Sequence, residues 1–154
     1  LLLEEQVSIR NLPLILESIA EARSLNSAEA ICEHARHRLS FQLIAEHKRA
    51  DGTVPLIQLA PEWELAFISH QAERDRGTKE VSLPPEQFAK LANNIVERVN
   101  RLAEKGISAA IITSTLRRRF LKNIVQAKGL KVSVLSYDEL SVDAKASIVG
   151  VVAA

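Results

Sequence analysis

The chain has 154 residues, 47% of them hydrophobic and 25% charged, so it is long enough for one domain or two small ones with hydrophobic cores, and disorder is not expected. Its 20 Lys and Arg residues nearly balance its 19 Asp and Glu residues, so no overall charge attracts it to nucleic acid or to an anionic membrane. The single cysteine excludes an internal disulfide and suits a reducing, cytosolic compartment.

The sequence contains no apolar run of the roughly 18 to 20 residues that a membrane-spanning helix requires, and no signal peptide is visible. It has no methionine and opens on Leu1-Leu2-Leu3. We therefore expect the chain to be a piece of a longer protein and its first region to be incomplete at the N-terminus.

The first predicted element is an amphipathic helix that ends near Arg23. Pro13 fits only in the first turn of a helix, where its missing N–H has no intrahelical partner, so the helix should begin near Asn11 or Leu12. Its apolar residues fall on one stripe of a helical wheel, at Ile9, Leu12, Ile15, Leu16 and Ile19. We expect a neighbouring element to cover this stripe.

Asn26 with Glu29 three residues later resembles a capping box and predicts the start of a second helix. Its apolar side carries Ala28, Ile31, Cys32, Ala35, Leu39 and Leu43. The two helices are expected to form a hairpin, a helical subdomain over residues 1–49. Cys32 lies on the apolar side, which favours a small core residue over a reactive thiolate.

Turn residues around Gly52 separate this hairpin from a second subdomain over residues 50–154. Strands are predicted at Val54–Leu59, Ile107–Thr113, Lys131–Ser136 and Ser147–Val152, and helices from Pro61, from Pro84-Pro85 to Gly106, and over Leu116–Lys128. The polar stretch Gln71–Glu80 is expected to be mobile. The β-α-β order predicts parallel strands with a right-handed crossover, so the fold class is α/β: a two-helix hairpin followed by a small α/β subdomain with a mostly parallel sheet.

The second helix also presents a candidate contact face away from its main apolar side. Glu33, His34 and His37 have the spacing of metal ligands, but the H-E-x-x-H pattern and a third strong ligand are missing, so no metal site is predicted. Phe41 and Ile44 make this side more apolar than a solvated helix face. His34, His37, Phe41 and Ile44 are therefore candidate partner-binding residues.

The strand-to-helix turn at Thr113–Arg119 is an alternative site, because free N–H groups at such turns bind phosphate in α/β folds. The candidate anion-binding residues are Ser114, Thr115, Arg117 and Arg118. The turn lacks the glycines that let the backbone approach a phosphate. Arginine in a first turn also opposes the helix dipole, which favours pairing with acidic residues or solvent instead. Phe120 is expected to be buried with Leu116 and Ile124.

The sequence shows no arrangement typical of nucleophilic catalysis. It has no G-x-S-x-G motif, and all four histidines, His34, His37, His47 and His70, precede the β-α-β unit. We therefore predict a protein that binds partners without catalysis and without a cofactor. The alternative is a small α/β enzyme or anion-binding domain that uses the Thr113–Arg119 turn.

Four segments together resemble the flagellar and type III secretion export-gate family. The stretch from Val7-Ser8-Ile9-Arg10-Asn11-Leu12 through Glu21 is similar to one of its signatures, and Val134–Leu140, V-L-S-Y-D-E-L, is similar to another near its C-terminus. Leu59-Ala60-Pro61-Glu62 and Leu116-Arg117-Arg118 lie between them in the family's order. The resemblance covers most of the chain.

The resemblance implies a bacterial inner-membrane protein whose cytosolic part has four subdomains and assembles into a ring. That ring receives export substrates and their chaperones, and it meets components of the ATPase complex. The chain is similar to the last two subdomains, which face the cytoplasm, and V-S-I-R favours the flagellar over the virulence branch. In the family the helical subdomain helps to build the ring, which suggests a role for the face of His34, His37, Phe41 and Ile44.

Overall fold

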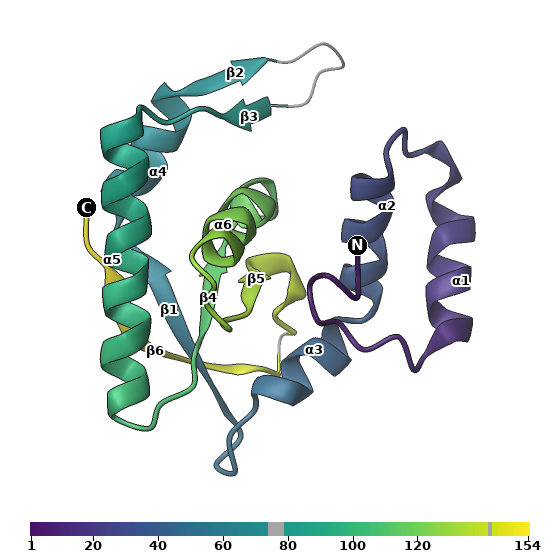
Figure 1. Cartoon of the computed structure of the whole chain (residues 1–154). Helices are drawn as coiled ribbons and strands as arrows, with labels where there is room; N and C mark the ends of the chain where they lie inside the picture. The colour runs from purple at the N-terminus through teal and green to yellow at the C-terminus, as the bar shows by residue number, and fades with distance from the viewer. Residues whose placement is uncertain (74–78, 142) are drawn as a thin grey trace.

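The computed structural model describes residues 1–73, 79–141 and 143–154 (Figure 1). The α-helices are α1 Leu12–Glu21, α2 Ala28–Arg38, α3 Ser40–His47, α4 Pro61–Ser69, α5 Pro85–Glu104 and α6 Thr115–Ala127, and two 3-10 turns are η1 Ala22–Ser24 and η2 Tyr137–Glu139. The strands are β1 Thr53–Leu59, β2 Gln71–Glu73, β3 Lys79–Val81, β4 Ala110–Thr113, β5 Val134–Ser136 and β6 Lys145–Val152.

The main sheet has four parallel strands in the order β5-β4-β1-β6, which confirms the predicted α/β class. β4 begins at Ala110 rather than at the predicted Ile107, and β5 begins at Val134 rather than at the predicted Lys131. Each strand follows residues that close the preceding helix. Gly106 and Gly129 adopt positive φ angles of 69° and 65° after α5 and α6. The next N–H groups, of Ile107 and Leu130, donate back to Leu102 and Val125, so they cap helices and cannot join the ladder.

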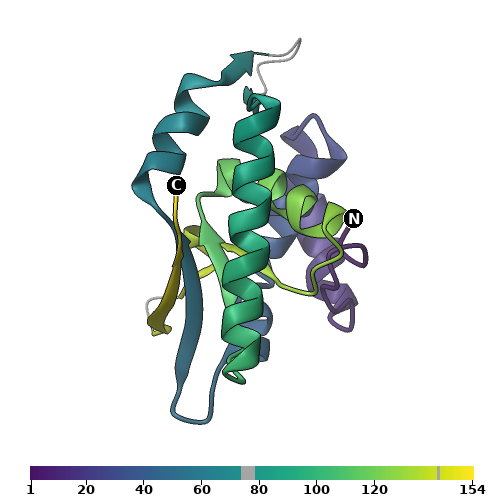
Figure 2. The same cartoon turned by 60° about the vertical axis from the view of Figure 1, so that its left-hand side comes forward.

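One face of the sheet is covered by α4, α5 and α6 (Figure 2). Each of these helices buries residues spaced by three or four positions, as an amphipathic helix on a sheet requires. The core on this side includes Ile57, Trp63, Phe67, Leu91, Ile95, Ile111, Leu121 and Ile124. The residues that these helices bury are therefore those that the helical spacing of apolar residues in the sequence predicts.

The opposite face of the sheet is covered by the N-terminal segment and α3, while α1 packs against α2 further from the sheet (Figure 1). Val7, Ile15, Leu39, Leu43 and Ile44 pack in one core with sheet residues Val54, Leu56, Ala110, Ile112 and Leu135. Residues of both predicted subdomains, 1–49 and 50–154, thus share this core. The helical region is joined to the sheet by packing as well as by the chain.

The helical region differs from the predicted hairpin in two details. The side chain of Ser27, not Asn26, caps α2, because its Oγ accepts the N–H of Ala30 at 3.1 Å. The second helix also divides into α2 and α3 at Leu39, whose N–H is shared between the carbonyls of Ala35 and Arg36. Leu39 is fully buried, so its side chain anchors this bend in the hydrophobic core. The helical region therefore contains three helices rather than two.

Two further predictions concern local segments. The ends of the polar stretch Gln71–Glu80 form an antiparallel hairpin, in which Gln71 pairs with Val81. The prediction of mobility for its middle, 74–78, lies outside the described residues. Leu116 was predicted to be buried but is 72% exposed, because it follows the N-cap Ser114 on the outer side of the first turn of α6, whereas Ile124 is buried.

Candidate interaction surface

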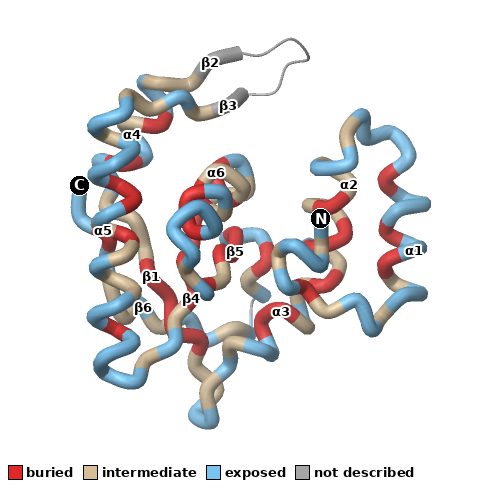
Figure 3. The backbone as a smooth tube through the Cα atoms, in the orientation of Figure 1, coloured by how far each residue is buried: buried red, intermediate tan, exposed pale blue. Residues whose placement is uncertain are grey.

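The most apolar exposed part of the α1 region is a stripe that we call the α1 stripe: Leu12, Leu16 and Ile19 on the helix and Ile9 in the segment that leads into it. Their exposed fractions are 53%, 63%, 44% and 38%, respectively. The prediction that a neighbour within this chain covers the whole stripe is therefore wrong. Of the five residues predicted to lie on it, Ile15 alone is buried. Figure 3 shows most of α1 in the colour of exposed residues.

The stripe is exposed because α1 turns a different side toward α2. The buried side consists of Ile15, Ser18 and Ala22, spaced by three and four residues. Ser18 is polar, but its hydroxyl donates to the carbonyl of Leu14 at 2.6 Å, so its burial leaves no donor unsatisfied. On a helical wheel Leu12, Leu16 and Ile19 lie about a quarter turn away from this side. The apolar arc of α1 is thus wider than its contact with α2.

The four candidate partner-binding residues do not form one face. Phe41 is 59% exposed and His37 is also exposed, while His34 is half-buried with its Nε2 3.1 Å from Glu21 Oε2. Ile44 is 6% exposed and packs in the core on the sheet, because the turn at Leu39 rotates α3 relative to α2. Ile44 is therefore not available to a partner in this fold.

The arginines of α6 are held by carboxylates rather than presented to solvent. Arg118 is fully buried; its Nη1 lies 2.6 Å from Glu5 Oε2 and its Nε donates to Glu33 Oε2 at 2.8 Å. Glu5 also pairs with Arg36 Nη1 at 3.0 Å. The carboxylate of Glu139 lies 2.9 Å from Arg36 Nε and accepts the N–H of Ser136 at 2.8 Å. We call Glu5, Glu33, Arg36, Arg118 and Glu139 the buried ion cluster.

The buried ion cluster shifts the pKa of two of its members, Glu5 and Arg118. Burial acts to raise the pKa of Glu5, but the hydrogen bond and charge of Arg118 and the charge of Arg36 outweigh it, so this pKa lies below its ordinary value. Burial acts to lower the pKa of Arg118, but Glu33 and Glu5 outweigh it and raise that pKa. The cluster joins the N-terminal segment, α2, α6 and η2 through ion pairs.

The predicted anion site is poorly suited to an anion. Arg117 is also buried, with its Nε 3.3 Å from Glu64 Oε1, and Thr115 donates a hydrogen bond to Asp138. A cavity of about 480 Å³ lies at the carboxyl ends of the strands and includes Ser114 among its lining residues. Glu64 also lines it, so a carboxylate would oppose a bound phosphate. The pairing with acidic residues that the sequence favoured is confirmed.

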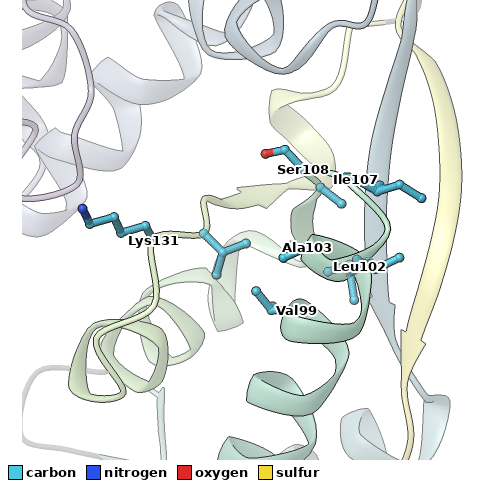
Figure 4. A pocket seen from close by; sticks show the side chains of 10 residues that line it. Val99, Leu102, Ala103, Ile107, Ser108 and Lys131 are labelled. Carbon is cyan, nitrogen blue, oxygen red and sulfur yellow. The ribbon is translucent and has the colours of Figure 1, made fainter.

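A second cavity, of about 300 Å³, lies where α5 ends (Figure 4). Val99, Leu102, Ala103 and Ile107 supply apolar walls, and Lys131 and Ser108 are its polar lining residues. These groups suit an apolar side chain. They lack the acid and base pair that proton-transfer chemistry requires.

The described residues contain no cluster of three or more His, Cys, Asp or Glu side chains placed to hold a metal ion. Cys32 is a buried free thiol; burial, together with the charges of Glu5 and Glu33, raises its pKa. In the same part of the chain, the helices are too short or too polar to cross a membrane.

Sequence reasoning missed the buried ion cluster and the exposure of α1. Glu33 and Glu5 are 85 and 113 residues from Arg118 in sequence, so no local pattern pairs them. The one available signal was the unfavourable place of arginines in a first helical turn, which calls for nearby acidic groups. It indicated that the arginines would pair with acidic residues, but it did not indicate which ones.

The comparisons agree with the resemblance found in the sequence. The FHIPEP family model matches residues 1–145. The flagellar biosynthesis protein FlhA of Caulobacter vibrioides is 33% identical over 153 residues, which are 98% of this chain and 22% of the relative. The invasion protein InvA of Salmonella typhimurium is 29% identical over 142 residues, 91% of this chain and 20% of the relative. The chain thus spans about a fifth of these relatives.

Solved structures show the same fold. The crystal structure of the C-terminal domain of InvA is 25% identical with a TM-score of 0.82, over 97% of this chain and 46% of that one. The nonameric SctV-C of EPEC is 20% identical with a TM-score of 0.83, over 98% of this chain and 45% of that one. The chain therefore belongs to the FHIPEP family, the family of flagellar and type III secretion export-gate proteins.

Proposed function

We propose that this chain is a cytoplasmic part of a bacterial flagellar export gate, where it helps to form a ring on which export substrates and their chaperones dock. The longer protein would be held in the inner membrane by other regions. In this proposal the chain performs no catalysis and binds no cofactor. The exposure of the α1 stripe in a chain of this family carries the proposal.

The α1 stripe has the form of a helix-packing surface. Leu12, Leu16 and Ile19 follow one another at spacings of four and three residues, which is the spacing of side chains that pack against another helix. Covering each side chain would contribute about 1 kcal/mol, using about 25 cal/mol per Å² of apolar area removed from water. Three such side chains are enough to favour a specific contact but not to make it permanent.

The backbone that presents the stripe is held in place. Asn11 caps α1 by accepting the N–H of Leu14 at 3.4 Å. Arg38 of α2 lies 3.4 Å from Glu17 and 3.6 Å from Glu21 on α1. These ion pairs are exposed and add little stability, but they lie beside the contact of α1 with α2 and favour one orientation. A preformed surface loses less conformational entropy when a partner binds.

The partners that we propose follow from the names of relatives. SctV-C of EPEC is described as nonameric, and the CdsV protein of Chlamydia pneumoniae was solved in complex with the CdsO protein. We infer that other copies of this protein occupy the α1 stripe, and that a component comparable to CdsO is among the further partners. His34, His37 and Phe41 form a second candidate contact, since Phe41 is 59% exposed.

We further propose that residues 1–49 and 50–154 act as two subdomains of this assembly. The first would contact neighbouring copies through α1, and the second would contribute the sheet and its cavities. The shared core around Val54 and Leu43 supports a fixed angle between the two.

The experiment compares substitutions on α1 in the full-length protein of a bacterium that needs it for motility. Leu16→Asp combined with Ile19→Asp is expected to abolish secretion of flagellar substrates and to lower ring assembly, because charge on the stripe opposes its burial. Asn123→Asp combined with Gln126→Asp, two exposed positions on α6 rather than α1, is the matched control and should leave both unchanged. Phe41→Asp tests the second contact separately.

Normal secretion and normal ring assembly in the double variant would contradict the proposal. Circular dichroism of the purified variants checks that the fold is intact. Because Leu16 and Ile19 are exposed here, their substitution should not unfold the chain.

A further inference from the structure

The outer edge of β6 is a second surface, separate from α1 and from the proposed ring contacts. The two edge strands of the sheet differ: β5 has three residues, all buried, whereas β6 has eight and is largely exposed. Within residues 1–73, 79–141 and 143–154, no strand pairs with the outer side of β6. In Figure 2, β6 lies beside β1 at the margin of the sheet.

The sequence of β6, K-A-S-I-V-G-V-V, carries few of the features that protect an edge strand. It has no proline, and Lys145 at its first position is its one charge. Ile148 and Val151 are 46% and 41% exposed. An edge that is long, apolar and almost free of charge is a template for an added strand.

The backbone groups of Val151 point toward this open edge. Successive residues of a parallel strand direct their amide groups alternately to the two sides. Val152 directs its carbonyl to β1, where it accepts the N–H of Ala60 at 2.9 Å. The preceding residue, Val151, therefore offers its N–H and C=O to a strand outside the sheet.

The two faces of β6 differ chemically. Ile148 pairs with Leu56, which belongs to the core on the face opposite α5, so Ile148 and Val151 lie on that apolar face. Gly150 and Val152 face α5. A Cβ on Gly150 would lie 2.9 Å from Arg98 Cδ, so the stem of Arg98 crosses the strand at this glycine.

The face toward α5 is basic near the end of β6. Arg98 and Arg101 line a cavity of about 220 Å³ together with Asn94, Glu97 and the backbone around Ala153. Among the described residues Arg98 forms no ion pair, and the partner of Arg101 is the exposed Glu97 one turn earlier at 2.5 Å. An acidic side chain from outside would therefore find at least one arginine available.

We propose that the outer edge of β6 binds an extended segment of a partner protein in which apolar and acidic side chains alternate, and that this segment adds to the sheet as a further strand. Because side chains of a strand alternate between its faces, the apolar ones would lie over Ile148 and Val151 and the acidic ones would reach Arg98 and Arg101.

A second copy of this chain is a poorer occupant of the edge. Pairing of β6 with β6 would bring the arginines of two copies together, which is unfavourable. The register between β1 and β6 shifts between Leu56 and Ile57, and this bulge would interrupt a strand added by either occupant, so it does not separate them. Charge favours an acidic segment from another protein.

The test uses a short fluorescent peptide in which valine and glutamate alternate, and fluorescence anisotropy with the full-length protein at low salt. We expect saturable binding. Arg98→Glu with Arg101→Glu should weaken it by about tenfold or more, the loss of roughly 1.4 kcal/mol or more of favourable charge interaction. Val151→Pro should abolish it, since proline removes the outward N–H. Lys128→Glu, exposed at the end of α6 over the β4–β5 side of the sheet, is the matched control.

Two further peptides sharpen the result. A peptide that alternates valine and lysine should not bind, and a valine–glutamate peptide with alternate amides N-methylated should not bind, because it cannot pair as a strand. Equal binding of either peptide, or no binding of the original one, would overturn the proposal. Self-association of the protein that Val151→Pro removes would also overturn it and assign the edge to a second copy. If Val151→Pro does not fold, Ile148→Asp replaces it.

Discussion

The buried ion cluster and the α1 stripe invert the usual distribution of polar and apolar side chains. Arg118 is charged and has no exposed surface, whereas Leu16 is apolar and is 63% exposed. The two arginines of the cluster are buried because each faces carboxylates on other segments, so their positive charge is neutralised within the chain. The leucine is exposed because α2 covers only one side of α1. The charged side chains of the cluster are already paired within the chain, so a partner of the helical region would contact mainly the apolar side chains of the α1 stripe.

The largest expected effect is the loss of Arg118. Arg118→Ala would leave Glu5 and Glu33 without their main partner and should lower the free energy of unfolding by about 3–5 kcal/mol. Urea unfolding followed by circular dichroism measures this. Arg119, which is 3.9 Å from Glu29 at an exposed pair, provides the control: Arg119→Ala should cost less than about 0.5 kcal/mol. Equal costs for the two variants would show that the cluster does not stabilise the fold.

The next largest expected effect is a difference in stability between alanine variants of two adjacent residues on α1. Ile15 is 7% exposed and Leu16 is 63% exposed, although both lie on the apolar arc of the helix. Ile15→Ala should lower the free energy of unfolding by about 2–4 kcal/mol, whereas Leu16→Ala should change it by less than about 0.5 kcal/mol. The same unfolding measurement decides it. If Leu16→Ala were the more costly of the two, α1 would be rotated relative to the structure described here.

A smaller effect should appear in the pH dependence of stability. The pKa of Glu5 is lowered in the folded chain, so the folded state holds its proton less tightly than the unfolded state. The stability that Glu5 contributes is therefore present above the ordinary carboxyl pKa of 4.5 and is lost as the pH falls through the lower folded value. Unfolding measured from pH 6 to pH 3 should show this loss, and Glu5→Gln should reduce its slope in this acid range. An unchanged slope in Glu5→Gln would exclude Glu5 as a source.

Much of the fold follows from the sequence because its elements have clear periods and clear ends. Pro61, Pro85, Gly106 and Gly129 mark helix boundaries that the structure confirms. The orientation of α1 does not follow, because Ile15 and Leu16 share one apolar arc and only the position of α2 decides which is covered. Ser18 adds to the difficulty, since it is polar yet completely buried.

Some of the predicted contact residues are exposed and others are buried, for a related reason. Phe41 and Ile44 are one turn apart in sequence, but the break at Leu39 places Phe41 in solvent and Ile44 in the core. The role of Arg118 depends on carboxylates of distant segments, which no local pattern specifies. Local patterns therefore predicted the elements, and contacts between distant segments decided the surface.

The measurement that tests the central idea most directly is thiol labelling of α1 in the assembled gate. Within this chain Cys32 is buried and its pKa is raised, so a maleimide should react here mainly with an introduced cysteine. We expect Leu16→Cys to label at least about tenfold more slowly in the assembled ring than in the dissociated protein, since labelling in the ring requires the contact to open. Glu17→Cys on the same helix should label at the same rate in both. Equal rates for Leu16→Cys in the two states would contradict the proposal that the α1 stripe is a contact between copies.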